Sequence, residues 1–340
     1  MSSLIADIAQ AIPGFNGWQP SEVSETAVLI PTEHATYRIV EIAPRIIRFY
    51  AHSPLEVDDV GAHAVMVGYL NDTAPLLMAG RLTRLTLTTY EDHTLLTSQA
   101  TIPLPQGLSA DQLSRILSRL IVESEIMLTY TSARFEHLPR YSMPYATSNM
   151  RTFLPAEILE PLKTATAPYD TLSQFLSLHV ANAPATGDLI TRIISLLEES
   201  EFTPAEPREV DDAWGVGATL NSDDAVFQFV ANPGLVSVVM IRTLPQALDQ
   251  QDALRLVDAG NAFADVFTMV NTDSGGLRSD TTEEKAEPVT QRILQSSFDT
   301  SFELTDEQLY ESLSNTITVV MNADRRLTEY QEFLEGESPE

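Results

Sequence analysis

The chain has 340 residues, of which 44% are apolar and 20% are charged, so it can build the cores of ordinary globular domains. It contains no cysteine, which excludes disulfides, thiol nucleophiles and thiolate metal sites. Its formal net charge of −28 disfavours nucleic acid and membrane surfaces as partners, because both carry negative charge.

In the first 140 residues, apolar periodicity and turn-forming residues predict three helices and five strands in the order α-βββ-α-ββ-α. The predicted elements are a helix over 4–12, strands over 27–31, 35–42 and 46–53, a helix over 58–77, strands over 82–90 and 94–102, and a helix that begins after Ser109.

A proline-rich linker is predicted over 141–184, where Leu172, Phe175 and Leu176 have the spacing of a short helix. The same order of elements then returns. It comprises a helix over 188–202, strands over 214–220, 225–231 and 236–243, a helix over 246–267, two strands within 268–301, and a helix over 305–333. The remainder, 335–340, is acidic, and we expect disorder after Leu334.

Both last helices begin with a capping-box sequence, Ser109-x-x-Gln112 in the first copy and Thr305-x-x-Gln308 in the second. In this motif the hydroxyl accepts a hydrogen bond from a main-chain N–H of the first turn, and the glutamine reaches back to the N–H of the cap residue. The pattern therefore fixes where each last helix starts.

The two halves are related by a predicted duplication. Residues 35–77 align with 225–267 at a constant offset of 190, which places Tyr37 on Phe227, Phe49 on Val239 and Asn71 on Asn261. A period this long indicates two copies of one domain rather than a solenoid of short repeats. We assign the first domain to 1–140 and the second to 185–334.

The element order, the asparagine near the end of each middle helix and the Ser/Thr-x-x-Gln-Leu opening of each last helix resemble the YbjN family in its actinobacterial form. The resemblance is closer in the second copy, where it spans 188–334. It implies an α+β fold with antiparallel sheets, similar to the type III secretion chaperones. Proteins of the family are described as candidate sensory transduction regulators without an assigned enzymatic activity.

The candidates for metal or acid–base chemistry are weak. Asp59 and His63 lie four residues apart on a predicted helix, with Glu56 nearby, but no third histidine follows at ligand spacing.

The paired acids Asp211-Asp212, Asp223-Asp224 and Glu283-Glu284 fall at predicted turns, and the run from Asp273 to Gly276 lacks calcium-loop spacing. Gly215-x-Gly217 lies in a predicted strand and is not a dinucleotide fingerprint. We assign no catalytic, cofactor-binding or metal-binding residue, and Asn71 and Asn261 are interpreted as structural.

Charge is concentrated in the second half. Residues 181–340 carry 9 Arg and Lys against 30 Asp and Glu, a net charge of −21, whereas residues 1–140 carry 9 against 15, a net charge of −6. Such a surface either provides solubility or forms a docking face for a basic partner.

The sequence predicts a non-enzymatic protein-binding module, a regulator or chaperone-like protein whose partner offers a basic or extended segment. Two copies on one chain are expected to form an intramolecular pseudo-dimer. The absence of a long apolar run and of signal-peptide features predicts a cytoplasmic location. The alternative is a small-molecule sensor or an enzyme with a site at an interdomain cleft.

Overall fold

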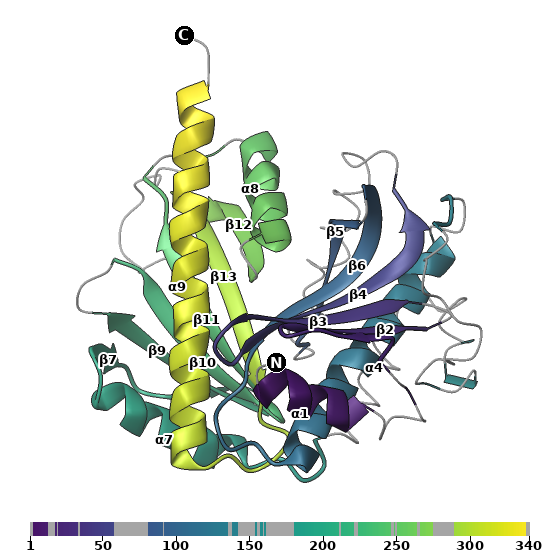
Figure 1. Ribbon diagram of the computed structural model, residues 1–340. Helices are drawn as coiled ribbons and strands as arrows, with labels where there is room; N and C mark the ends of the chain where they lie inside the picture. Colours follow the sequence, from purple (N-terminus) through teal and green to yellow (C-terminus); the bar gives the residue numbers. More distant parts are fainter. Residues whose placement is uncertain are drawn as a thin grey trace. The chain divides into compact units, whose positions relative to one another are not determined.

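We analysed a computed structural model of the chain (Figure 1). The structure describes residues 3–12, 18, 20–32, 35–57, 81–90, 92–134, 138–141, 154, 157–158, 160, 180–210, 212–220, 224–245, 248, 250–263, 266–274 and 289–337. The chain divides into two compact units, each with an antiparallel sheet and a small number of helices. Unit 1 comprises Met1–Ala183 and Phe298–Ser312, and unit 2 comprises Pro184–Ser297 and Leu313–Glu340.

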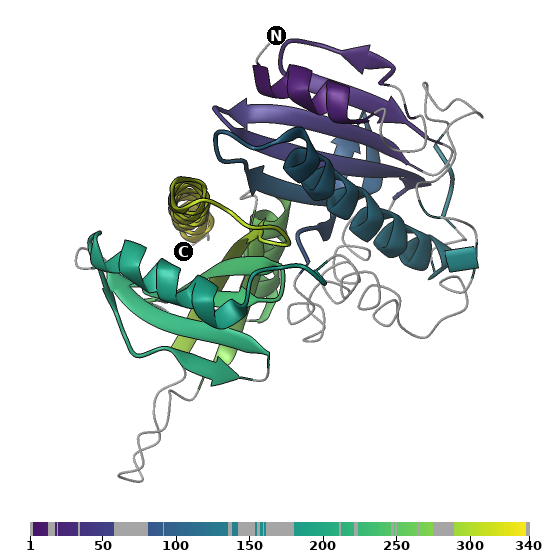
Figure 2. The same cartoon turned by 90° about the horizontal axis from the view of Figure 1, so that it is seen from below.

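Unit 1 contains a six-stranded sheet in the order β1-β2-β3-β4-β6-β5. Its described elements are α1 (Ser3–Ala11), β1 (Glu22–Val23), β2 (Ala27–Pro31), β3 (Thr36–Ala43), β4 (Ile46–Glu56), β5 (Arg84–Tyr90), β6 (His93–Pro103) and α4 (Ala110–Arg134). Helices α1 and α4 pack on the same face of this sheet, as Figures 1 and 2 show. The predicted middle helix over 58–77, with Asn71, lies outside the described residues, as do the predicted linker helices.

The two faces of this sheet differ in chemistry. The face under the helices is apolar, with Tyr37, Ile39 and Phe49 at most 1% exposed. The opposite face carries polar side chains at most of the alternate positions of the inner strands, because successive side chains of a strand point to opposite faces. Its buried polar members include Thr36, His52, Arg84, Thr86, Thr97, Gln99 and Thr101.

Unit 2 contains a seven-stranded sheet in the order β12-β13-β11-β10-β9-β7, with β8 paired to β9. Its elements are α7 (Thr186–Glu198), β7 (Phe202–Pro204), β8 (Arg208–Val210), β9 (Ala213–Leu220), β10 (Val226–Asn232), β11 (Leu235–Thr243), α8 (Gln250–Phe263), β12 (Phe267–Ser274), β13 (Val289–Asp299) and most of α9 (Asp306–Glu337). Two arginines of the sheet, Arg242 and Arg292, donate to Asp324 of α9 and hold this helix to the strands.

The inner strands of the two sheets follow the same order. Strands β2-β3-β4-β6-β5 of unit 1 correspond to β9-β10-β11-β13-β12 of unit 2. The short strands β1, β7 and β8 are additions that the sequence analysis did not predict.

The gapless offset of 190 is wrong for one of the repeated strands. In unit 1 Phe49 pairs with Ile39, but in unit 2 the residue paired with Phe229 is Val238, not Val239. The cause is a bulge between Glu41 and Ala43, which adds one residue to the first hairpin. Val239 therefore lies on the opposite face from Phe227 and Phe229, although the constant offset aligned it with Phe49.

Both capping boxes are present as predicted. The N–H of Ser109 donates to Gln112 Oε1 (2.8 Å) and the N–H of Gln112 donates to Ser109 Oγ (3.2 Å). The corresponding distances for Thr305 and Gln308 are 3.1 and 3.2 Å. Each pair satisfies two N–H groups that a helix start leaves without a partner, which explains why these boundaries were readable.

Three predicted boundaries in the second half are wrong. The first helix ends at Glu198 because Ser200 caps its last turn, donating from Oγ to the carbonyl of Leu197 (2.7 Å), and Phe202 enters β7. The middle helix ends at Phe263, because the segment from Phe267 pairs with β13. The last helix continues to Glu337, so 335–337 are helical rather than disordered.

A buried ion-pair network lies within unit 1. Arg119 of α4 donates from Nε to Glu123 (2.9 Å) and from Nη1 to Asp299 (3.2 Å), and all three side chains are at most 1% exposed. The other oxygen of Glu123 accepts from the N–H groups of Leu82 (2.8 Å) and Thr83 (3.0 Å), which immediately precede β5. Burial lowers the pKa of Arg119, but the charges and hydrogen bonds of the two carboxylates outweigh this and raise its pKa.

Replacing Gly260 by alanine is expected to destabilise unit 2 by about 1–3 kcal/mol, because the added Cβ would lie 2.0 Å from Thr268 Oγ1. This clash outweighs the gain of about 1 kcal/mol that alanine gives a helix interior. Gly217→Ala is the control, since its Cβ would meet its nearest neighbour at 4.0 Å. Urea unfolding followed by circular dichroism measures both, and equal stabilities would contradict the close packing of α8 on β12.

Arg119→Met is expected to cost about 3–5 kcal/mol of unfolding free energy, because it leaves two buried carboxylates without their cation. Arg115→Met, on the same helix, removes an exposed pair with Asp111 (3.3 Å) and should cost less than about 1 kcal/mol. Thermal and urea unfolding of both variants test this difference. Losses of similar size would show that the buried network contributes no more than a surface ion pair.

Candidate binding pocket on the first sheet

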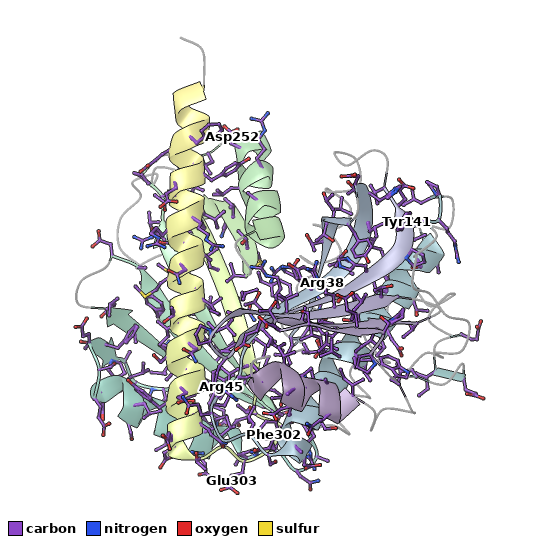
Figure 3. All side chains as sticks on the ribbon, in the orientation of Figure 1. Arg38, Arg45, Tyr141, Asp252, Phe302 and Glu303 are labelled. Carbon is purple, nitrogen blue, oxygen red and sulfur yellow. The ribbon has the colours of Figure 1, made fainter. Side chains whose placement is uncertain are left out.

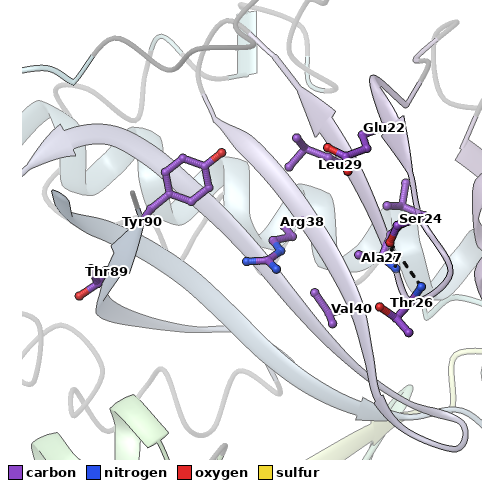
Figure 4. A pocket seen from close by; sticks show the side chains of 10 residues that line it. Glu22, Ser24, Thr26, Ala27, Leu29, Arg38, Val40, Thr89 and Tyr90 are labelled. Carbon is purple, nitrogen blue, oxygen red and sulfur yellow. Dashed lines mark hydrogen bonds between the residues drawn. The ribbon is translucent and has the colours of Figure 1, made fainter. Parts of the chain in front are cut away.

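A pocket of about 410 Å³ lies on the polar face of the unit 1 sheet (Figure 4). It is lined by Glu22, Ser24, Thr26, Ala27, Val28, Leu29, Arg38, Val40, Thr89 and Tyr90. Six of these ten residues are polar, including one carboxylate and one guanidinium. The pocket is therefore polar and carries both signs of charge.

The curl of the sheet creates this pocket. Most of the lining comes from β1, β2, β3 and the β1–β2 turn, but Thr89 and Tyr90 come from the end of β5. Two strands, β4 and β6, separate β3 from β5 in the sheet. The sheet must bend to bring both ends to one cavity, and Figure 4 shows Arg38 between Tyr90 and the β1–β2 residues.

The rim on the β1 side is held by a tight turn. Ser24 Oγ accepts from the N–H groups of Ala27 (3.0 Å) and Thr26 (3.4 Å), drawn as dashed lines in Figure 4. The N–H of Ser21 donates to the carbonyl of Leu29 (2.9 Å), which extends the pairing beyond the two residues of β1. Ser24 therefore forms the turn, a common role for serine, and is not placed as a nucleophile.

Arg38 supplies the positive charge of the pocket (Figures 3 and 4). It faces Leu29 on β2, and Leu29 in turn faces Glu22 on β1, so the acid and the base lie two strands apart. Arg38 is exposed, and among the described residues no acceptor lies within hydrogen-bond or ion-pair distance of its guanidinium. This cation is thus available to a ligand.

His52 lies beside the pocket at the centre of an aromatic and hydroxyl cluster. Its ring stacks on Tyr50 (5.4 Å between centroids) and is tilted against Tyr90 (5.0 Å). Its Nδ1 lies 3.0 Å from Thr97 Oγ1 and 3.3 Å from Thr88 Oγ1. The cluster connects β4, β5 and β6 and fixes Tyr90 at the pocket wall.

The electrostatic environment keeps His52 neutral at physiological pH. Burial, followed by the positive charge of Arg38, lowers the pKa of His52 to about 4. His52 Nε2 is buried without a hydrogen-bond partner, as is Oγ1 of its cross-strand neighbour Thr36. An unpaired imidazole nitrogen is tolerated far better uncharged than charged, which agrees with the direction of the shift.

The arrangement offers hydrogen-bond donors, acceptors and both signs of charge to a ligand. Among the described lining residues no nucleophile is paired with a general base, and the carboxylate and guanidinium lie on different strands. Within the described ranges no group of three or more histidine or acidic side chains could hold a metal ion. Among the helices that the structure describes, none is long and apolar enough to cross a membrane.

The structure places few of the sequence candidates near one another. Glu56 pairs with His93 (2.7 Å), and Asp59 and His63, the other members of the predicted group, lie outside the described residues. Also outside are Asp211, Asp223, Glu283 and Glu284. Gly215 and Gly217 lie within β9 as predicted, Asp273 is in β12 rather than in a turn, and Asn261 is in α8.

The sequence analysis missed Arg38 and Tyr90. Arg38 could have been noticed as a charged residue inside a strand of otherwise β-forming residues, between Tyr37 and Ile39. Its proximity to Tyr90 had no sequence signal, because 51 positions separate the two residues and the curl of the sheet joins them.

No protein-family model matches this sequence, and no curated protein is similar to it. Among solved structures, the chain is similar to the crystal structure of YbjN from E. coli, described as a candidate transcription regulator. The sequence identity is 15%, the TM-score is 0.30, and the match covers 38% of this chain and 93% of the YbjN chain. A similarity this low supports at most a distant relation and carries no argument about function.

Stability is expected to fall as the pH drops from 6.5 to about 4. Between these pH values His52 binds a proton in the unfolded state but not in the folded state. Protonation therefore stabilises the unfolded state and lowers the free energy of unfolding by up to about 3 kcal/mol. Above pH 6.5 this contribution is fully present. His52→Gln should remove this part of the pH dependence, whereas His93→Gln, whose ring is 36% exposed, should retain it. Urea titrations across the pH range measure the slopes, and identical slopes in wild type and His52→Gln would refute the assignment.

Proposed function

We propose that this chain is a non-enzymatic protein-binding module, a regulator or chaperone-like protein, that takes up an extended segment of a partner protein in the unit 1 pocket. The single observation that carries the proposal is the polar pocket on the curled sheet, whose described lining offers donors, acceptors and both charges to a partner. We further propose that each unit has a YbjN-like fold related to the type III secretion chaperones; the antiparallel sheet and the helices of each unit are consistent with this α+β class.

An extended segment fits this site better than a compact small molecule. The pocket adjoins β1, the terminal strand of the described sheet, and a terminal strand can hydrogen-bond an added strand through its main chain. Val23 of β1 is 41% exposed and offers apolar contact beside the polar lining. Small-molecule sites, in contrast, are mostly enclosed and apolar.

The charge of the chain favours a segment that is basic overall. A net charge of −28 attracts cations over distances of about 10 Å at ordinary salt, and so accelerates encounter with a basic partner. We therefore propose that the partner is basic, because the negative charge of the chain attracts it over a long range.

The proposal is tested by selecting peptides from a random displayed library on the immobilised whole chain, followed by affinity measurement in solution. Thr26→Trp places a large side chain in the pocket lining from an exposed turn position and should weaken binding at least about tenfold. Glu25→Trp adds the same side chain at the adjacent exposed position, which does not line the pocket, and should leave the affinity unchanged.

Two results would reject this function. The first is a library that yields no binding peptide. The second is an equal affinity for peptides in Thr26→Trp, Glu25→Trp and wild type, which would move binding away from the pocket.

A further inference from the structure

We infer that Arg38 is the specificity-determining residue of the unit 1 pocket and that it binds a carboxylate of the partner's extended segment. The carboxylate comes either from an Asp or Glu side chain or from the C-terminus of the segment. This inference rests on the proposed function and adds the ligand chemistry to it.

The guanidinium of Arg38 is accessible to a ligand. Arg38 lines the pocket and is exposed, and no described carboxylate or carbonyl pairs with it. Other arginines of the same unit have such partners: Arg45 donates to the carbonyl of Leu104 (2.9 Å) and Arg115 pairs with Asp111 (3.3 Å). In a chain with 48 acidic residues, a pocket cation that no described carboxylate contacts is positioned for a carboxylate of a ligand.

The geometry of the Arg38 guanidinium matches a carboxylate. A guanidinium presents a planar fork of N–H donors that matches the two oxygens of a carboxylate, and such pairs are stronger and more directional than neutral hydrogen bonds. The hydroxyls of Thr26 and Thr89 lie in the same lining and provide additional donors. Glu22, two strands away, excludes a second anion from the β1 side and orients the segment.

The net charge of the chain disfavours a free anion as the ligand of Arg38. The overall negative charge of the chain repels small anions, so one guanidinium at an exposed site gains little from an isolated carboxylate. A carboxylate carried by a segment that also pairs with β1 is held at high effective concentration, which removes most of this disadvantage.

The charge of Arg38 also gives the site an independent readout. Because Arg38 lowers the pKa of His52, a carboxylate that neutralises Arg38 must raise it. The described groups around His52 are Arg38 on β3, Tyr50 on β4, Thr88 and Tyr90 on β5 and Thr97 on β6, and Arg38 is the charged one among them. The His52 ring therefore reports on the charge state of the pocket.

The test uses a selected peptide in four forms: with its acidic residue or the matching amide, and with a free or an amidated C-terminus. Wild type should bind one acidic form at least about tenfold more tightly than its amide, and that form identifies the source of the carboxylate. Arg38→Gln should abolish this preference, and Arg38→Lys should keep only part of it because the fork is lost. Arg208→Gln, an exposed site in unit 2 with the same change in net charge, should leave it intact.

Nuclear magnetic resonance of the His52 ring is the second readout. Binding of the acidic peptide should raise the pKa of His52 from about 4 in wild type and leave it unchanged in Arg38→Gln. If the acidic and amide peptides bind equally while Thr26→Trp still blocks both, the pocket binds segments and the assignment of Arg38 is wrong. If no peptide binds in any form, both the proposed function and this inference are rejected.

Discussion

The buried guanidinium of Arg119 is the interaction on which the candidate site depends. It neutralises Glu123, and Glu123 in turn holds the main chain of Leu82 and Thr83 at the entry to β5. Strand β5 then carries Thr88 to the His52 cluster and Tyr90 to the pocket wall. A cation and several N–H groups surround this carboxylate and offset the cost of burying it. The position of the pocket wall thus follows from an ion pair on the opposite side of the sheet.

The two faces of the unit 1 sheet differ in the side chains that they carry. One face is apolar and packs against α1 and α4, which accounts for the burial of Tyr37, Ile39 and Phe49. The other face presents hydroxyls, an imidazole and guanidinium groups, whose desolvation is favourable only where partners are supplied. The unpaired polar atoms of His52 and Thr36 lie on this second face. Sequence alternation alone separates the two faces, but the helices decide which of them becomes the core.

The two units show how one pattern accommodates different polar solutions. Unit 1 places Arg119 and Glu123 on its last helix, whereas unit 2 uses Arg242 and Arg292 of the sheet with Asp324 of α9. Burial is the largest influence on Arg292 and lowers its pKa, despite the neighbouring carboxylate. In unit 1 Glu123 links its helix to the main chain before β5, whereas in unit 2 the link is an ion pair between Asp324 and arginines of the strands. Strand order is therefore compatible with substantial change in the buried electrostatics.

The sequence by itself determined the local features: the capping boxes at Ser109 and Thr305, most strand positions and the two α+β halves, because these depend on neighbours a few residues apart. Tertiary structure decided the rest. The one-residue register shift between the hairpins depends on a bulge, which no periodicity reveals, and so Val238 rather than Val239 faces the core. The pocket depends on the curl of the sheet, which brings Tyr90 to Arg38. The register shift and the pocket both depend on how strands pair across the sheet, and this pairing is fixed only when the whole sheet has formed.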